Sequence, residues 1–296
     1  MSEIILVAGG TGFTGSRTVP MLARRGLDLR CLVRREGDAQ YFKRLGAEPV
    51  FADLEDPGSL AMAFEGVSGL ISMVGLHTGH AAAMVDAAVA AGVKRALFVT
   101  STSIFTRPDT STKRHLLEAE KRIRDSGLDY TIIRPTMVYG DEQDRNICRL
   151  IRYLARWPVL FIPGPGTWRV QPVYVDDAAG AIADAWQTPG TIGKCYNISG
   201  REPLTFNALV DTVSALLKRK IMKIHLPVSP LVAACKRAET AGLSFFVRSD
   251  QIERLNEDKS FAHDEATADF QFAPVSFETG VRREIEAMGL IREEGQ

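Results

Sequence analysis

Short apolar runs alternate with helical patterns through the first half of the chain. Six runs are short, apolar and bounded by turn residues, as buried strands are; they cover residues 4–8, 29–33, 49–52, 70–74, 95–100 and 130–134. The stretches between them have helical spacing or capping residues, at 13–25, from 56 onward, at 80–91 and at 112–126. Strands that alternate with helices over short connections predict a parallel sheet covered by helices on both faces.

The second half of the chain is less regular. It predicts helices at 142–156, 176–187 and 205–218, strands at 194–199 and 221–225, and a Pro/Gly/Trp-rich segment at 157–168. This pattern is too irregular for a second doubly wound domain. We expect residues 1–140 to form the sheet domain, 168–200 to return to it, and 141–296 to form mainly a smaller lobe. Ligands of such sheets bind at the C-terminal edges of the strands, where this lobe would lie.

A glycine-rich run follows the first strand and opens the first helix: Gly9, Gly10, Thr11, Gly12, Phe13, Thr14 and Gly15. It satisfies both the GxGxxG and the GxxGxxG spacing. A turn without Cβ atoms lets backbone N–H groups approach a pyrophosphate at a helix N-terminus. At the first β–α junction of an alternating pattern, the run predicts a dinucleotide site rather than a merely flexible turn.

The end of the second strand selects the cofactor. NAD-binding domains usually place Asp or Glu there, to hold the ribose 2′-hydroxyl, whereas this chain has Arg34 and Arg35. Two guanidinium groups attract a 2′-phosphate, which favours NADP(H) over NAD(H) unless both only solvate the strand end. Asp53 and Leu54 follow the third strand and are candidates for the adenine edge, although Asp53 could equally be a turn residue.

Several of these motifs together resemble the extended short-chain dehydrogenase/reductase superfamily, which includes the NAD-dependent epimerase/dehydratases. The resemblance rests on the glycine run and on short motifs that follow it in the family's order: Asp53-Leu54, Arg134-Pro135, Tyr139-Gly140 and 173–177. It covers roughly residues 3–280, and the run 120–135 is most similar to the atypical branches. Those are the NmrA-like proteins and the relatives of the nucleotide-binding accessory subunit of respiratory complex I.

This resemblance implies an α/β fold of the Rossmann type, a doubly wound parallel sheet with a smaller C-terminal substrate lobe. It also implies further cofactor contacts at the ends of later strands, which we assign to Val74, Gly75 and Pro135. The substrate would then lie between the sheet and the second lobe. Candidate cleft residues of that lobe are Arg145, Trp157, Trp168 and Arg169.

The catalytic residues of the superfamily are only partly present. Active members use a Ser or Thr on the fifth strand and a Tyr-x-x-x-Lys pair on the next helix, in which the lysine lowers the pKa of the proton-transferring tyrosine. Alignment places the serine at Ser101, but the tyrosine and lysine positions fall on Thr112 and Leu116. No tyrosine lies between Tyr41 and Tyr130, so a small shift of the alignment cannot restore the pair.

Substitutes for the missing pair are His115 and Tyr139. An imidazole side chain can exchange protons, but His115 is one residue from the expected lysine, and a shift of one residue turns a helix position by about 100°. Tyr139 follows the sixth strand and could contact nicotinamide or substrate, with packing as the alternative. His77 and His80 form an HxxH pair without a third ligand, so we expect no metal site. The two adjacent aspartates, Asp176 and Asp177, are predicted to cap a helix rather than to act as an acid/base pair.

Composition narrows the class of protein. The chain has 296 residues, with 36 basic and 36 acidic side chains and a formal net charge of zero. This balance argues against nucleic-acid binding. No apolar run is long enough to cross a bilayer, the N-terminus lacks the pattern of a secretory signal, and the four cysteines are widely spaced. We therefore expect a cytoplasmic protein with reduced thiols and no membrane insertion.

Taken together, the residues predict an NADP(H)-dependent oxidoreductase or isomerase/epimerase that acts on a small organic substrate. In this hypothesis Ser101 holds the substrate oxygen and another group replaces the tyrosine as proton donor. One alternative is a redox sensor or assembly factor that binds the cofactor without turnover and acts on a protein partner. Another is an enzyme that only positions the reactants and takes its proton from water. The retention of a full-length second lobe favours an enzyme.

Overall fold

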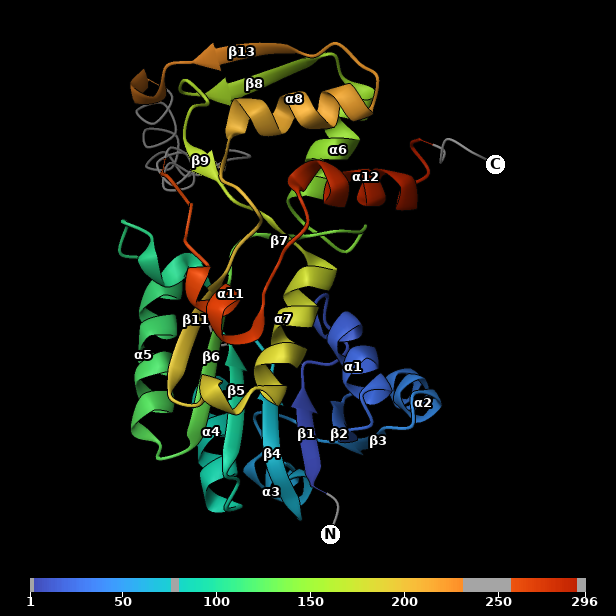
Figure 1. The fold of residues 1–296 in the computed structure, drawn as a ribbon, viewed down its shortest axis with the longest axis vertical. Helices are drawn as coiled ribbons and strands as arrows, with labels where there is room; N and C mark the ends of the chain where they lie inside the picture. The colour runs from blue at the N-terminus through green and yellow to red at the C-terminus, as the bar shows by residue number, and fades with distance from the viewer. Residues whose placement is uncertain (1–2, 76–79, 231–256, 292–296) are drawn as a thin grey trace, which may run out of the picture.

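A seven-stranded parallel sheet forms the base of the molecule in the computed structural model, which describes residues 3–75, 80–230 and 257–291 (Figure 1). Its strand order is β11-β6-β5-β4-β1-β2-β3. The strands are β1 (Ile4–Ala8), β2 (Asp28–Val33), β3 (Glu48–Phe51), β4 (Val67–Ser72), β5 (Arg95–Val99), β6 (Asp129–Pro135) and β11 (Lys194–Ile198). The sequence predicted β1 exactly and the other strands to within a few residues, and the predicted α/β fold class is confirmed.

Helices cover both faces of this sheet, because its strands bury apolar side chains alternately on each side. Ile5 and Val7 of β1 join one core cluster, and Leu6 and Ala8 join the other. The first cluster lies under α1 (Gly15–Arg24), α2 (Glu36–Arg44), α7 (Val175–Gln187) and α11 (Asp264–Phe270). The second lies under α3 (Pro57–Ala63), α4 (His80–Ala90) and α5 (Ser111–Asp125).

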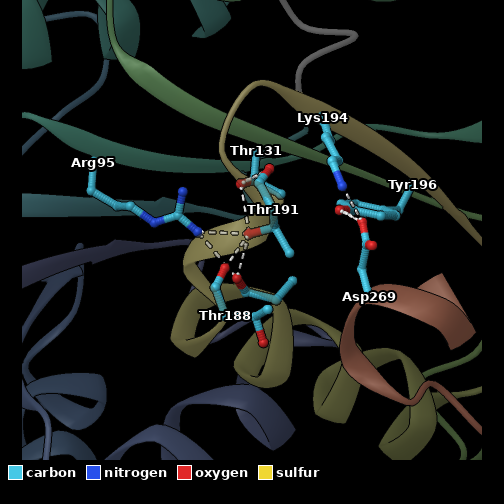
Figure 2. A network of polar contacts seen from close by, with 8 residues as sticks. Arg95, Thr131, Thr188, Thr191, Lys194, Tyr196 and Asp269 are labelled. Atoms are coloured by element: carbon cyan, nitrogen blue, oxygen red, sulfur yellow. Dashed lines mark hydrogen bonds and ion pairs between the residues drawn. The ribbon is translucent and has the colours of Figure 1, made fainter. Parts of the chain in front are cut away.

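The chain leaves the sheet after β6 and returns to it at β11, which pairs with β6 in parallel. Polar contacts hold this return in place (Figure 2). The Arg95 guanidinium on β5 donates to the Thr191 hydroxyl at 2.8 Å, just before β11. On β11 itself, the Lys194 ammonium and the Tyr196 hydroxyl both bind the Asp269 carboxylate of α11. Residues far apart in sequence thus close one edge of the sheet.

A smaller lobe lies at the C-terminal ends of the strands, at the top of Figure 1. The helices that the structure describes there are α6 (Ile147–Arg156), α8 (Phe206–Leu216) and α12 (Phe277–Ala287), and they share one apolar core. Short parallel and antiparallel ladders complete it: β8 (Val159–Pro163) with β13 (Met222–Leu226), β7 (Val138–Tyr139) with β10 (Val173–Tyr174), and β9 (Arg169–Val170) with β12 (Leu204–Thr205). The second lobe therefore closes over the sheet edge where ligands of such folds bind.

Two local predictions for the second half of the chain were wrong. The helix predicted at 142–156 begins only at Ile147, because Asp141 and Asp144 accept hydrogen bonds from the backbone N–H groups two residues further on. Such local bonds compete with helix formation. The helix predicted at 176–187 begins at Val175, so Asp176 and Asp177 lie in its first turn and do not cap it.

The remaining sequence expectations concern cysteines and membranes. Cys31, Cys148 and Cys195 are free thiols, and Cys235 lies outside the described residues. Among the helices that the structure describes, none is both long enough and apolar enough to cross a bilayer.

Candidate functional site

The glycine loop is built for close backbone contact. Gly9 has a φ of +79°, and a Cβ there would come within 2.8 Å of the Met73 carbonyl carbon at the end of β4. A Cβ on Gly15 would overlap the carbonyl oxygen of Gly9. Any larger residue at either position would push the start of α1 away from the sheet. The loop therefore leaves the N-terminus of α1 open toward a ligand, as a bound pyrophosphate requires.

A cavity of about 780 Å³ opens beside this loop, at the ends of β1, β2, β3 and β4. It brings together most of the predicted cofactor residues: Gly9, Thr11, Gly12, Arg34, Asp53, Leu54, Val74 and Gly75. Asp53 lines the cavity and also acts as a turn residue, since its Oδ1 accepts a hydrogen bond from the Glu55 N–H at 3.0 Å. The glycine cradle and the guanidinium at the end of β2 fit a dinucleotide.

The other predicted cofactor residues do not line this cavity. Gly10 faces the core, where a Cβ would meet Val19 and Phe42. The rest are more peripheral: Phe13 packs against the core of the second lobe, Thr14 precedes α1, Gly15 begins α1, Arg35 precedes α2, and Pro135 ends β6. Of the two arginines, only Arg34 is therefore placed to meet a ligand in this cavity.

A second cavity of about 450 Å³ continues from the first, with which it shares Met73, Val74 and Gly75. Ser101 lines it, and its hydroxyl donates to the Ser103 hydroxyl at 3.0 Å. Facing Ser101 across this cavity are Thr112 and Leu116 of α5. The structure thus brings the two aligned positions to the same cavity as Ser101, and neither position carries a tyrosine or a lysine.

The two predicted substitutes lie elsewhere. His115 is exposed on α5 and lines a different cavity, between α4 and α5. Tyr139 is 1% exposed, packs against Tyr174 and Phe277, and donates its hydroxyl to the Phe277 carbonyl at 3.4 Å. Burial raises the pKa of Tyr139 above its usual range. Positions of this kind favour packing for Tyr139 and a surface role for His115 over catalysis.

A third cavity of about 340 Å³ extends from Ser101 and Ser103 toward the second lobe. The rings of Phe105 and Phe261 meet at its wall with centroids 5.4 Å apart. Glu257 also lines it, and its carboxylate accepts hydrogen bonds from the Thr106 hydroxyl and the Arg107 N–H. Sequence reasoning missed Glu257 and Phe261, because they contact residues about 150 positions away and no local pattern marks them.

The four predicted cleft residues of the second lobe do not line this third cavity. Trp168 is buried in the lobe core and stacks on Phe206, and Trp157 is exposed beside Arg156. Arg169 is also exposed on β9. Arg145 lines the first cavity instead, beside the glycine loop.

The motif 120–135 supports the wall of the third cavity. Glu120 is 1% exposed, and Arg134 binds both of its oxygens, while Thr100 donates to Oε1 at 2.9 Å. Burial alone would raise the pKa of Glu120, but the hydrogen bonds and charge of Arg134, with Thr100 and Arg124, lower it. The Arg134 guanidinium lies 5.5 Å from the ring of Phe105. This ion pair is therefore structural and positions an aromatic side chain of the cavity.

The histidine pair is only partly described. His80 begins α4 and lines the first cavity, whereas His77 lies outside the described residues. Within the described ranges, no group of three or more His, Cys, Asp or Glu side chains is arranged to hold a metal ion.

Comparison with known proteins agrees with the geometry of the first cavity. The sequence profile of a family described as NAD(P)H-binding matches residues 9–151, from the glycine loop into α6. The chain carries an NAD(P)-binding domain, and its homologues belong to the atypical short-chain dehydrogenase/reductase superfamily. The fold agrees as well: the crystal structure of gox2253 matches this NAD(P)-binding chain with a TM-score of 0.81 at 24% identity, over 97% of this chain and 98% of that one.

Two curated relatives of this NAD(P)-binding chain have different roles. One is the mitochondrial NADH dehydrogenase [ubiquinone] 1 alpha subcomplex subunit 9 of Dictyostelium discoideum, 28% identical over 76% of this chain and 67% of that protein. Another is the NAD(P)H azoreductase of Xenophilus azovorans, 28% identical over 75% of this chain and 77% of that protein. Relatives of this domain therefore include both a subunit of a larger assembly and an oxidoreductase.

Proposed function

We propose that this protein is an NADPH-preferring reductase of small conjugated acceptors, such as quinones or azo compounds. The observation that carries the proposal is the pair Thr112 and Leu116, which faces Ser101 where the superfamily has tyrosine and lysine. An isolated ketone becomes a strongly basic alkoxide on hydride transfer and needs an acid beside it. A conjugated acceptor becomes a delocalised anion, which can take its proton from water.

The three cavities adjoin one another, and in this proposal their residues have different roles. When bound, the nicotinamide supplies the hydride, and the reduced acceptor gains one proton from solvent. Ser101, at the junction of the second and third cavities, turns its hydroxyl from Ser103 to donate a hydrogen bond to the acceptor's oxygen or nitrogen. Phe105 and Phe261 offer apolar ring faces to a flat substrate.

Arg34 supports the preference for NADPH. It lines the first cavity at the end of β2, the place where an acidic residue would bind the ribose 2′-hydroxyl of NAD(H). A guanidinium there can form charge-assisted hydrogen bonds with a 2′-phosphate.

The azoreductase among the relatives supports a flat, conjugated acceptor as the substrate.

A rate assay with matched acceptors tests this function. NADPH oxidation is followed with a benzoquinone, an azo dye and a saturated ketone, and we expect turnover with the first two only. Ser101→Ala should lower turnover about tenfold while leaving the Kd for NADPH unchanged, because Ser101 touches the acceptor and not the cofactor. Preferred reduction of the saturated ketone would contradict the proposal, since it would require the proton donor that the second cavity lacks among its described residues.

A second candidate function is cofactor binding without turnover, as a redox sensor or an assembly factor with a protein partner. The same replacement of tyrosine and lysine favours it, together with the relative that is a subunit of a larger assembly. Tight NADPH binding with no oxidation for any acceptor would support this candidate. It would then direct the search to protein partners that bind differently with NADPH and NADP⁺ present.

A further inference from the structure

One arginine of the second lobe lines the cofactor cavity. Arg145 lies between β7 and α6, whereas the other lining residues fall between residues 9 and 80, in the sheet domain. It shares the cavity with Arg34. Neither guanidinium forms a hydrogen bond or an ion pair with another residue in the described part of the chain. Their donors are thus available to an anionic ligand, and they approach it from different lobes.

The acidic neighbours of Arg145 are bound elsewhere. Asp144 is 5% exposed and accepts hydrogen bonds from the N–H groups of Asn146, at 2.7 Å, and Cys148, at 2.9 Å. Asp141 accepts from the Arg17 guanidinium at 2.9 Å. These contacts fix the backbone on both sides of Arg145. Its guanidinium is therefore held at the cavity without being neutralised by the carboxylates next to it in sequence.

The contact with Arg17 places this segment beside the glycine loop. The helix α1 begins at Gly15, so Arg17 lies in its first turn. The start of a helix that follows a glycine loop is where dinucleotide-binding domains hold the diphosphate. The hydrogen bond between Arg17 and Asp141 therefore joins the stretch that contains Asp141 and Arg145 to the first turn of α1. Arg145 therefore approaches the end of the cavity that suits a diphosphate.

The cavity also contains two carboxylates, Asp53 and Glu55, which follow β3. In the strand order β4-β1-β2-β3, the end of β3 lies two strands away from the loop that follows β1. An anion at the glycine loop is thus separated from these carboxylates by the end of β2. Positive charge at the loop end of the cavity favours an anion, whereas the carboxylates at the other end suit the uncharged adenine base.

We propose that Arg145 binds the diphosphate of the dinucleotide from the second lobe, while Arg34 binds the 2′-phosphate. This inference rests on the proposed cofactor and extends it, because it makes the second lobe part of the cofactor site. The bound dinucleotide then connects both lobes through two arginines and the N-terminus of α1. Arg145 recognises a phosphate group common to NADPH and NADH, whereas Arg34 recognises a group that only NADPH carries.

Fluorescence titrations of three variants test the assignment. Arg145→Gln should raise the Kd of NADPH and of NADH by the same factor, about tenfold at low salt. Arg34→Gln should raise the Kd of NADPH alone. Arg149→Gln is the matched control, because Arg149 is exposed on α6 of the same lobe and is not among the residues of this cavity. It should change neither Kd more than twofold.

Competition with adenine nucleotides identifies the phosphate that Arg145 binds. In wild-type protein ADP should displace NADPH better than AMP, and Arg145→Gln should remove most of that difference. Equal Kd values for Arg145→Gln and Arg149→Gln would overturn the assignment, and so would a loss confined to NADPH. Failure of wild-type protein to bind either dinucleotide would instead overturn the proposed function itself, so the two failures are distinguishable.

Discussion

Each lobe buries a glutamate completely, but only one of them is paired. In the sheet domain, Glu120 is 1% exposed, and its oxygens accept hydrogen bonds from Thr100, Arg124 and Arg134. In the second lobe, Glu284 on α12 is fully buried, and neither of its oxygens has a hydrogen-bond partner among the described residues. The two environments therefore favour opposite charge states of a glutamate side chain.

The difference appears in the pKa values of the two carboxyls. Burial would raise the pKa of Glu120, but Arg134 and its other partners lower it. For Glu284, burial comes first, the charges of Asp144 and Asp141 add to it, and Arg152 opposes them, so the pKa rises from 4.5 to about 8. Glu120 is thus kept charged and Glu284 is kept neutral near pH 7. The surroundings of each buried carboxyl therefore favour one protonation state: the charged state for Glu120 and the neutral state for Glu284.

The largest effect is expected from removing the main partner of Glu120. Arg134→Ala should lower the free energy of unfolding by about 3–5 kcal/mol, because it leaves a buried charge without its bidentate partner. Urea denaturation measures this loss. Arg122→Ala is the control: its ion pair with Asp86 is exposed, so it should cost less than about 1 kcal/mol. Equal losses of unfolding free energy in the two variants would show that the buried ion pair stabilises the protein no more than an exposed one.

Glu284 should make stability depend on pH in the neutral range. Its pKa in the folded protein, about 8, exceeds the ordinary 4.5. The folded state therefore holds a proton that the unfolded state loses, and stability falls as pH rises from about 4.5 to 8. The difference in unfolding free energy between wild type and Glu284→Gln should shift by about 2–4 kcal/mol over this range, in favour of the variant at high pH. A constant difference would contradict this.

Glu120 should show the opposite dependence. Its folded-state pKa is lowered, so its stabilising contribution is present above its ordinary pKa of 4.5 and is lost as pH falls through the folded-state value. Glu120→Gln should cost about 2 kcal/mol at pH 7, the value of charge-assisted hydrogen bonds, and less at acid pH. Thermal melts of wild type and variant from pH 7 downward should therefore converge. A difference in melting temperature between wild type and variant that stays the same at every pH would contradict the paired state of this carboxyl.

The smallest effect concerns binding and should leave both carboxylates undisturbed. Arg34→Glu should weaken NADPH binding by about 1–2 kcal/mol and spare or improve NADH binding, because a charge-assisted contact with the 2′-phosphate is replaced by repulsion. Titration of both cofactors measures the ratio. Wild-type protein with equal affinity for NADPH and NADH would remove the basis for assigning the phosphate to Arg34.

The sequence predicted the sheet domain better than the second lobe. The strand β1 was exact, and the helix predicted from residue 56 onward begins at Pro57, where Asp56 accepts a hydrogen bond from the Gly58 N–H. Such signals are local: apolar runs, caps and glycines act within a few residues. In the second lobe, β8 pairs with β13, more than 60 positions away along the chain, and β8 has no alternation of apolar and polar residues. Only the folded chain reveals that pairing.

The same distinction applies to the site. The glycine loop, Ser101, Thr112 and Leu116 were located because each follows a strand or falls at a fixed position of a helix. The contact between Glu257 and Thr106 had no such marker. His115 is one helix position away from Leu116, and that single step places it in a different cavity, between α4 and α5.

The late return of β11 has a consequence for biosynthesis. As the chain emerges from the ribosome, β6 is complete at Pro135, but the strand that covers its open edge ends only at Ile198. During that interval a nascent chain presents an unpaired strand edge, the kind of surface on which other chains aggregate. Of the helices in the second lobe that the structure describes, α6 is synthesised before the sheet is closed, whereas α8 and α12 follow β11. A fragment that stops at residue 140 would keep that edge exposed permanently, so we expect it to precipitate on expression.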